Sequence, residues 1–158
     1  MNRWHVRQAD PEGAEAVALI AAHDAHGAEH YPAESNHNLG GAALAAANAQ
    51  FYVAEETSGV PIGMGAFVAL SNPSGAVEIK SMFVADKVRG QGVASTILDH
   101  LVRMARQQGF TYAFLETGSK EASAAARALY ESRGFVYCDP FGDYTLDPES
   151  VFMTRKLA

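Results

Sequence analysis

The sequence predicts a mixed α/β fold in which a sheet of strands is flanked by helices. Strand-like runs separated by the turn signals Ser58-Gly59 and Asn72-Pro73-Ser74-Gly75 indicate antiparallel hairpins. Between the runs 76–84 and 111–115, apolar residues recur at helical spacing, and this strand–helix–strand order indicates a parallel pair. The chain has 158 residues, enough to bury a substantial core, and we expect residues 1–158 to form one domain.

Each element follows from a local signal. Asp10-Pro11-Glu12 is typical of a helix start, because Asp caps the helix, Pro fits the first turn and Glu favours the positive end. Gly27 is expected to break this helix after about His26, and Gly134 stands where a left-handed residue usually closes a helix. The expected order is a strand at 4–7, a helix at 10–26, a loop at 27–38, a short helix at 41–49, strands at 51–55, 60–70 and 76–84, a loop at 85–91, a helix from 93 to Gly109, a strand at 111–115, a helix at 120–133, and strands at 135–138 and 151–156.

Composition argues against several classes of protein. The net charge is −6 and the basic residues are scattered without a basic stripe, which disfavours a nucleic-acid partner. No apolar run approaches the roughly 20 residues of a membrane span, and the N-terminal segment 1–10 lacks an apolar signal core. Cys138 is the single cysteine, so an internal disulfide and a cysteine-based zinc site are excluded. We therefore expect a soluble cytoplasmic protein.

The segment from Phe83 to Ala94 is the most informative part of the chain. In this segment a strand ends, a glycine-containing loop follows, and an amphipathic helix begins. The start of such a helix presents free backbone N–H groups and a partial positive charge, which suit the binding of a pyrophosphate. The glycines could instead make only a turn. Gly90-Gln91-Gly92 could also belong to the dinucleotide loop of an NAD-linked oxidoreductase, with Glu116 ending the next strand, but Ser95 replaces the third glycine. A nucleotide-triphosphate loop is excluded, because Gly-Lys-Ser/Thr is missing.

A third interpretation, coenzyme A, comes from a family resemblance. Arg89-Gly90-Gln91-Gly92-Val93-Ala94 resembles the signature Arg/Gln-x-x-Gly-x-Gly/Ala of the GNAT superfamily of N-acetyltransferases. Val77–Val84 resembles the fourth strand of that family, and Leu129–Phe135 resembles its Leu-Tyr-x-x-x-Gly-Phe helix ending. The segments Tyr31–His37 and Cys138–Tyr144 further resemble a group of small bacterial acetyltransferases. The blocks follow the family order over nearly the whole chain.

The resemblance implies both a fold and an activity. The fold is a central mixed, mostly antiparallel sheet of six to seven strands flanked by about four helices, with a splayed parallel pair at strands four and five. The activity is that of an enzyme that moves an acetyl group from acetyl-CoA to a primary amine of a small molecule or a peptide N-terminus by direct attack. No metal is expected. A non-catalytic acyl-CoA-binding or sensor module on the same fold is the alternative.

The resemblance also implies positions for the cofactor. Amide groups at the helix start would hold the pyrophosphate, the fourth strand would pair with the pantetheine arm, and a side chain of the later helix would touch the cofactor. Ser123 stands at that last position, where the family commonly has Asn. The implied cofactor-binding residues are Met82, Phe83, Val84, Arg89, Gly90, Gln91, Gly92, Val93, Ala94 and Ser123.

Three residues are candidates for the chemistry. Tyr130 would protonate the departing thiolate, with a core aromatic as the alternative role. Glu78 in the fourth strand would take the proton of the amine, although an ion pair with Lys80 on the same face is the structural alternative. Glu116 at the end of the fifth strand is the second candidate base, with a helix cap as its alternative.

The region of His23, His26, His30 and His37 is rich in histidine. These side chains have spacings that could form a metal site, but the expected break at Gly27 disfavours it, and we expect them to be solvated or to line the acceptor entrance. The tail 139–150 is expected to close the acceptor pocket, to wrap the sheet or to form a homodimer contact. The sequence leaves the acceptor, the acyl chain length and the oligomeric state open.

Overall fold

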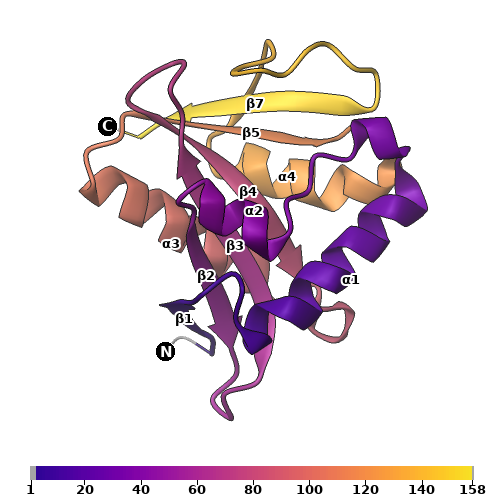
Figure 1. The fold of residues 1–158 in the computed structure, drawn as a ribbon, viewed down its shortest axis with the longest axis vertical. Coiled ribbons are helices and arrows are strands. Elements are labelled where there is room, and N and C mark those ends of the chain that lie inside the picture. The colour runs from indigo at the N-terminus through magenta and orange to yellow at the C-terminus, as the bar shows by residue number, and fades with distance from the viewer. Residues whose placement is uncertain (1–2, 158) are drawn as a thin grey trace.

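Seven strands form a single sheet within residues 3–157, the part of the chain that the computed structural model describes (Figure 1). The strand order is β1-β2-β3-β4-β5-β7-β6, and only the β4–β5 pair is parallel. The strands are β1 (His5–Gln8), β2 (Gln50–Glu55), β3 (Pro61–Ala69), β4 (Ala76–Val84), β5 (Tyr112–Gly118), β6 (Val136–Cys138) and β7 (Ser150–Lys156). The mixed sheet, the antiparallel hairpins and the parallel pair expected from the sequence are confirmed.

Helices cover both faces of this sheet. The α-helices are α1 (Ala14–His30), α2 (Gly41–Ala46), α3 (Val93–Gln107) and α4 (Ala124–Ser132), and short 3-10 turns are η1 (Ala33–Ser35), η2 (Asp86–Val88) and η3 (Glu121–Ser123). In Figure 1, α1 and α2 lie in front of the central strands, while α3 and α4 lie behind. Because β2 is buried on both faces, its residues alternate between two cores: Phe51 packs on the α1–α2 side and Tyr52 on the α3 side.

The β4–β5 pair separates halfway along its length. Its register runs from Ala76 opposite Tyr112 to Ile79 opposite Leu115 and stops there. Beyond that point β4 remains paired with β3 as far as Val84, whereas β5 remains paired with β7 as far as Gly118. The splayed parallel pair implied by the family resemblance is therefore present, and a groove opens where the two strands part.

Helix α1 differs from the sequence prediction at both ends. Asp10 accepts a 2.9 Å hydrogen bond from the backbone N–H of Glu12 in a preceding turn, and the helix itself begins after Gly13. At the other end the helix continues through Gly27 to His30 instead of breaking. A Cβ at Gly27 would lie 2.9 Å from the side-chain nitrogen Nδ2 of Asn36. Glycine at this position therefore lets the loop after the helix pack closely against it.

Candidate active site

The loop before α3 exposes its backbone. Gly90 and Gly92 adopt φ angles of +79° and +90°, a region that favours glycine, and the space next to both Cα atoms is open. No side chain caps the start of α3, so its first N–H groups remain free for a ligand. Arg89 folds back over this loop, donating to the carbonyl of Val84 at 3.2 Å and pairing with Asp86 at 2.9 Å. This geometry is that of an anion site at a helix N-terminus.

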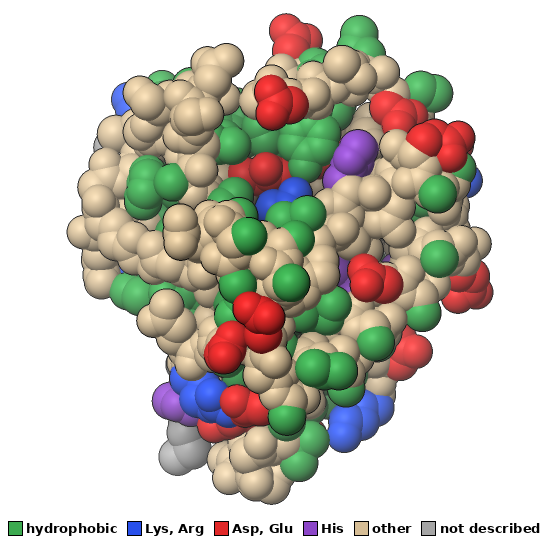
Figure 2. Space-filling model, in the orientation of Figure 1, with side chains coloured by type: hydrophobic (Ala, Val, Ile, Leu, Met, Phe, Trp, Pro, Cys, Tyr) green, Lys and Arg blue, Asp and Glu red, His purple; other side chains and the backbone are tan. Residues whose placement is uncertain are grey.

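A cavity of about 590 Å³ runs from this loop along β4 into the gap between β4 and β5. Figure 2 shows the hollow at its open side, where acidic and basic side chains lie together beside hydrophobic ones and a histidine. The cavity brings together every residue that the sequence singled out for cofactor or catalysis except Gln91. The side chain of Gln91 accepts a 3.4 Å hydrogen bond from Arg3 instead.

A bulge at Ser81 changes the direction of the β4 side chains. Glu78 and Lys80 line the cavity, and strict alternation would place Met82 on the same face of β4 as these two residues. Met82 instead packs against the core under α3 and Phe83 against the core under α1, although both residues also line the cavity. The extra residue in the strand is Ser81, whose φ angle is +60° and which lies within a register shift of the β3–β4 pairing.

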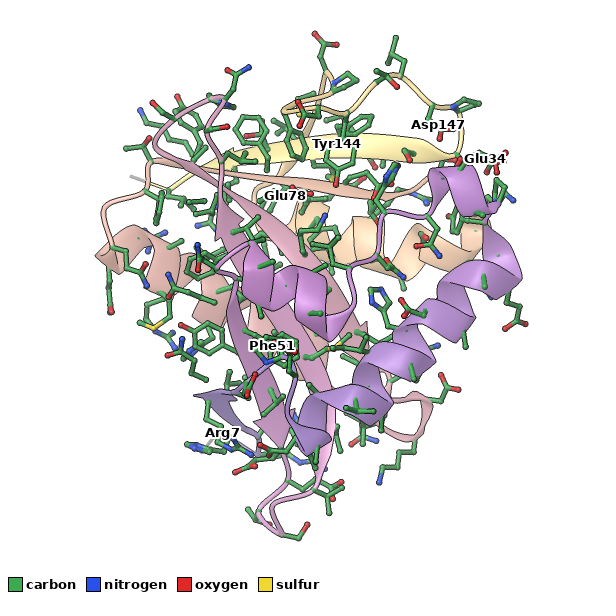
Figure 3. The ribbon with its side chains drawn as sticks, viewed as in Figure 1. Arg7, Glu34, Phe51, Glu78, Tyr144 and Asp147 are labelled. Carbon is green, nitrogen blue, oxygen red and sulfur yellow. The ribbon has the colours of Figure 1, made fainter. Side chains whose placement is uncertain are left out.

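Glu78, Lys80 and Tyr144 form a closed triangle of hydrogen bonds. The Lys80 ammonium donates to Glu78 Oε2 and to Tyr144 Oη, both at 3.1 Å, and Tyr144 Oη donates to the same Glu78 oxygen at 2.6 Å. Glu78 is only 7% exposed, and Figure 3 shows Tyr144 lying directly above it. The Glu78–Lys80 ion pair, which the sequence offered as the structural alternative for Glu78, is present. The sequence did not predict the contacts of Tyr144 with Glu78 and Lys80. Its only local indication was an aromatic residue in the tail 139–150.

The chain between β6 and β7 is tied down around this end of the cavity. Ser35 donates to Asp147 at 2.6 Å, and Lys120 pairs with Glu149 at 3.4 Å. The hydrogen bonds of Ser35 and the nearby backbone N–H of Glu149 hold the pKa of the Asp147 carboxyl below its usual range. Together with Tyr144, these contacts make the tail a wall of the cavity, one of the three roles that the sequence left open.

Glu116 occupies the other side of the gap, on β5. Its Oε2 accepts a 2.7 Å hydrogen bond from Ser150. Burial raises the pKa of this carboxyl, and the hydrogen bond from Ser150 and the charges of His37 and Lys80 only partly oppose that rise. A carboxylate with a raised pKa is a stronger proton acceptor than an ordinary one.

Tyr130 comes from α4 and belongs to the same cavity as Glu78 and Glu116. Its side chain is 6% exposed, contacts the ring of Phe135 edge to face, and lines the cavity. Burial, reinforced by the charge of Glu116, raises the pKa of the phenol. Tyr130 therefore keeps its proton at neutral pH and is both a core aromatic and a residue of the cavity wall.

Ser123 is engaged by the protein itself. Its hydroxyl lies 2.8 Å from Tyr31 Oη, and the backbone N–H of Lys120 donates to the same phenol at 3.0 Å. This contact joins the end of α1 to the turn between β5 and α4. Gly118 is required beneath it, because a Cβ there would collide with the Tyr31 ring.

The histidines of α1 form part of the cavity wall. His23 and His26 line the cavity, and His23 lies against Phe83 with a ring distance of 5.4 Å. Burial lowers the pKa of His23 to about 4, so the ring is neutral at pH 7. His37 contacts Tyr144 edge to face. Within residues 3–157 no group of three or more His, Cys, Asp or Glu side chains is arranged to hold a metal ion.

Comparison with known proteins identifies the family. The sequence model of the acetyltransferase (GNAT) family matches residues 11–135. The chain is 40% identical over 153 residues to the N-acetyltransferase YsnE of Bacillus subtilis, covering 97% of this chain and 99% of that protein. It is 39% identical to an IAA acetyltransferase of Azospirillum brasilense, covering 89% of this chain and 90% of that protein.

Solved structures agree with this result. A structure from Klebsiella pneumoniae, described as an acyl-CoA N-acyltransferase, superposes with a TM-score of 0.80 at 29% identity and covers 98% of both chains. The yncA acetyltransferase of Salmonella typhimurium, solved with acetyl-CoA, has the same fold at a TM-score of 0.73 and 23% identity, covering 99% of this chain and 95% of that one.

The chain therefore belongs to the GNAT acetyltransferase family. It is an acetyl-CoA-dependent N-acetyltransferase. This assignment rules out the dinucleotide-binding interpretation of the glycine loop. None of the helices in residues 3–157 has the length and apolar character needed to span a membrane.

Proposed function

We propose that this enzyme transfers the acetyl group to a primary amine of a small molecule or a peptide N-terminus by direct attack. The observation that carries the proposal is one continuous cavity that joins an uncapped helix start to one buried and one partly buried carboxylate, with a buried phenol in its wall. These are the groups that such a transfer needs: an anion site, a proton acceptor and a proton donor.

Acetyl-CoA fits the cofactor half of this cavity. The backbone N–H groups of residues 90–94 would hold the pyrophosphate, because the glycines leave the backbone open and α3 adds a partial positive charge. The strand β4 beyond Lys80 has no partner on the β5 side, so Met82, Phe83 and Val84 can pair with the amides of the pantetheine arm. Ser123 would contact that arm through its hydroxyl, which also forms a hydrogen bond with Tyr31 Oη.

Glu116 is the carboxylate better suited to take the proton of the amine. One oxygen of Glu78 already accepts hydrogen bonds from Lys80 and Tyr144, so that oxygen is not free to accept a proton from the amine. Burial raises the pKa of Glu116, which strengthens it as a base. In this proposal Glu78 orients the acceptor with its other oxygen, and it remains the alternative base.

Tyr130 would donate the proton that the departing sulfur needs. The raised pKa of its phenol keeps the proton in place until a thiolate develops beside it. A thiol has an ordinary pKa near 8.5, so this donation assists the reaction without being obligatory.

The acceptor end carries one carboxylate in excess. Lys80 pairs with Glu78 and Lys120 pairs with Glu149, whereas the cavity offers Glu116 no such partner within residues 3–157. A single ammonium group therefore suits this end of the cavity better than an anion does. The aromatic rings of Tyr144 and His37 would contact the body of the acceptor.

Two measurements test the proposal. Calorimetry should detect binding of acetyl-CoA, and thiol release across a panel of amino acids, aliphatic amines, aminosugars and peptides should identify an acceptor. Binding without thiol release from any amine would instead favour the sensor module, and absence of binding would contradict both. Sedimentation of the purified protein would decide whether it forms the homodimer left open by the sequence.

A further inference from the structure

Ser81 carries an unfavourable backbone conformation. Its φ angle is +60°, and Asn48 is the other residue besides glycine with a positive φ angle in the described part of the chain. Asparagine tolerates this region well, whereas serine pays a larger cost. At a β-bulge of this kind the left-handed position is usually glycine, which adopts it without strain.

The side chain of Ser81 adds a second cost. Its hydroxyl is buried without any hydrogen-bond partner, the only side-chain oxygen or nitrogen atom in residues 3–157 in that situation. A buried polar atom left unpaired is unfavourable, because it has lost its contacts with water and gained none from the protein. Glycine at this position would remove both costs at once.

These two costs fall at one place in the active site. Ser81 lines the cavity two residues after Ile79, the last residue of β4 that pairs with β5. On one side of it lie Glu78 and Lys80 at the acceptor end, and on the other lie residues 82–84 at the cofactor end. The point between the two ends is where an acyl group must meet an amine.

We propose that the Ser81 hydroxyl donates a hydrogen bond to the carbonyl oxygen of the acyl thioester. This inference rests on the proposed function. The hydroxyl is unpaired in the free protein, and Ser81 lines the cavity. A bound ligand then supplies the acceptor that the protein does not.

The hydrogen bond has a direct consequence for the reaction. As the amine nitrogen forms its bond to the carbonyl carbon, an electron pair of the carbonyl moves onto the oxygen that Ser81 contacts. The attacking nitrogen loses its proton to Glu116, and when the carbonyl re-forms, the carbon–sulfur bond breaks, so that sulfur keeps the bonding electron pair and takes a proton from Tyr130. The negative charge on the oxygen is largest after the amine has attacked and before the carbonyl re-forms. A hydroxyl that donates to this oxygen therefore stabilises the transition state more than the ground state.

Ser81→Ala and Ser81→Gly test this role in two independent ways. The first readout is thermal unfolding of the free protein: both variants should be at least as stable as the wild type, and Ser81→Gly should be the most stable. The second is turnover: kcat should fall by about 10- to 100-fold, as for the loss of one donor to a developing oxyanion. The control is Ser132→Ala, which removes an exposed hydroxyl bonded to Leu129 and should leave kcat unchanged.

A binding experiment isolates the carbonyl contact without turnover. The probes are an S-acetonyl-CoA analogue, which keeps the carbonyl, and S-ethyl-CoA, which lacks it. The wild type should prefer the carbonyl-bearing probe, and Ser81→Ala should reduce that preference by about fivefold, the effect of one hydrogen bond.

The outcomes separate this inference from the proposed function. An unchanged preference in Ser81→Ala, or a variant that is less stable than the wild type with full kcat, would overturn the role of Ser81 alone. Failure of the wild type to bind either probe would overturn the proposed function together with it.

Discussion

The hydroxyl of Tyr144 donates a 2.6 Å hydrogen bond to Glu78 Oε2 across 66 positions of sequence (Figure 3). Glu78 comes from the middle of β4, and Tyr144 comes from the loop between β6 and β7. Lys80 completes the contact, so the carboxylate is held by two donors before any acceptor arrives. The loop therefore helps to fix the acceptor end of the cavity.

Removing this hydroxyl is predicted to loosen Glu78. Tyr144→Phe keeps the ring contacts with Phe141, Phe152 and His37 but leaves Glu78 with Lys80 alone. The free energy of unfolding should fall by about 1–2 kcal/mol, and KM for the acceptor should rise while acetyl-CoA affinity stays the same. Tyr137→Phe is the matched control, because it removes an exposed hydroxyl bonded to Glu131, and urea unfolding should detect little change.

The two carboxylates are predicted to respond differently to amidation. Glu116→Gln should lower kcat by about a hundredfold or more and abolish the fall in rate at acidic pH. The sign follows from the pKa: burial raises it, so the base is lost as pH falls through a value above the ordinary 4.5. Glu78→Gln should mainly raise KM for the acceptor. The dependence of kcat on pH in both variants checks this. If Glu116→Gln kept the fall in rate at acidic pH and Glu78→Gln lost it, the base would be Glu78.

Tyr130→Phe is predicted to slow the chemical step. The ring keeps its packing against Phe135, so stability should change little, while the proton donor is lost. Single-turnover rates with pre-bound acetyl-CoA should fall by about ten- to a thousandfold, and acetyl-CoA affinity should not. Full activity in a folded Tyr130→Phe enzyme on its true acceptor would leave Tyr130 with a packing role only.

Gly92→Glu is predicted to abolish acetyl-CoA binding, because it puts a side chain and a negative charge at the start of α3. Strain alone is controlled by Gly59→Glu, since Gly59 has a φ angle of +87° against +90° for Gly92 and equally open surroundings in a turn that does not line the cavity. Both variants should lose similar stability, and only Gly92→Glu should lose binding in calorimetry. Equal binding in the two variants would argue that the phosphates lie elsewhere.

His23 is predicted to make stability depend on pH. Burial lowers its pKa from 6.5 to about 4, so the folded state binds fewer protons than the unfolded state in this window. The stability that comes from the neutral ring is complete above pH 6.5 and is lost as pH falls toward 4, by up to about 1.4 kcal/mol per pH unit. His23→Gln should flatten this slope in urea unfolding, and His5→Gln, at an exposed position of β1, should not.

Much of the fold was predictable from the sequence because its signals are local. Turn residues at Ser58-Gly59 and residues 72–75 fixed the hairpins, and helical spacing after Gly92 fixed the parallel connection. The glycine loop was recognisable for the same reason, since a strand end, two glycines and a helix start lie within a dozen residues. Glu78, Glu116 and Tyr130 were found through the family resemblance, and the cavity contains all three.

Tertiary structure alone decided the features that depend on contacts between distant residues. The sequence predicted that Gly27 breaks a helix, yet α1 continues through it and the side chain of Asn36 packs against it. Ser81 looked like an ordinary strand residue, and only its φ angle and unpaired hydroxyl mark it. Tyr144 and Glu78 are 66 residues apart, and no periodicity or turn signal records which loop returns to which strand. Burial and pairing of polar groups are properties of the packed chain, so the electrostatics of the site came from the structure.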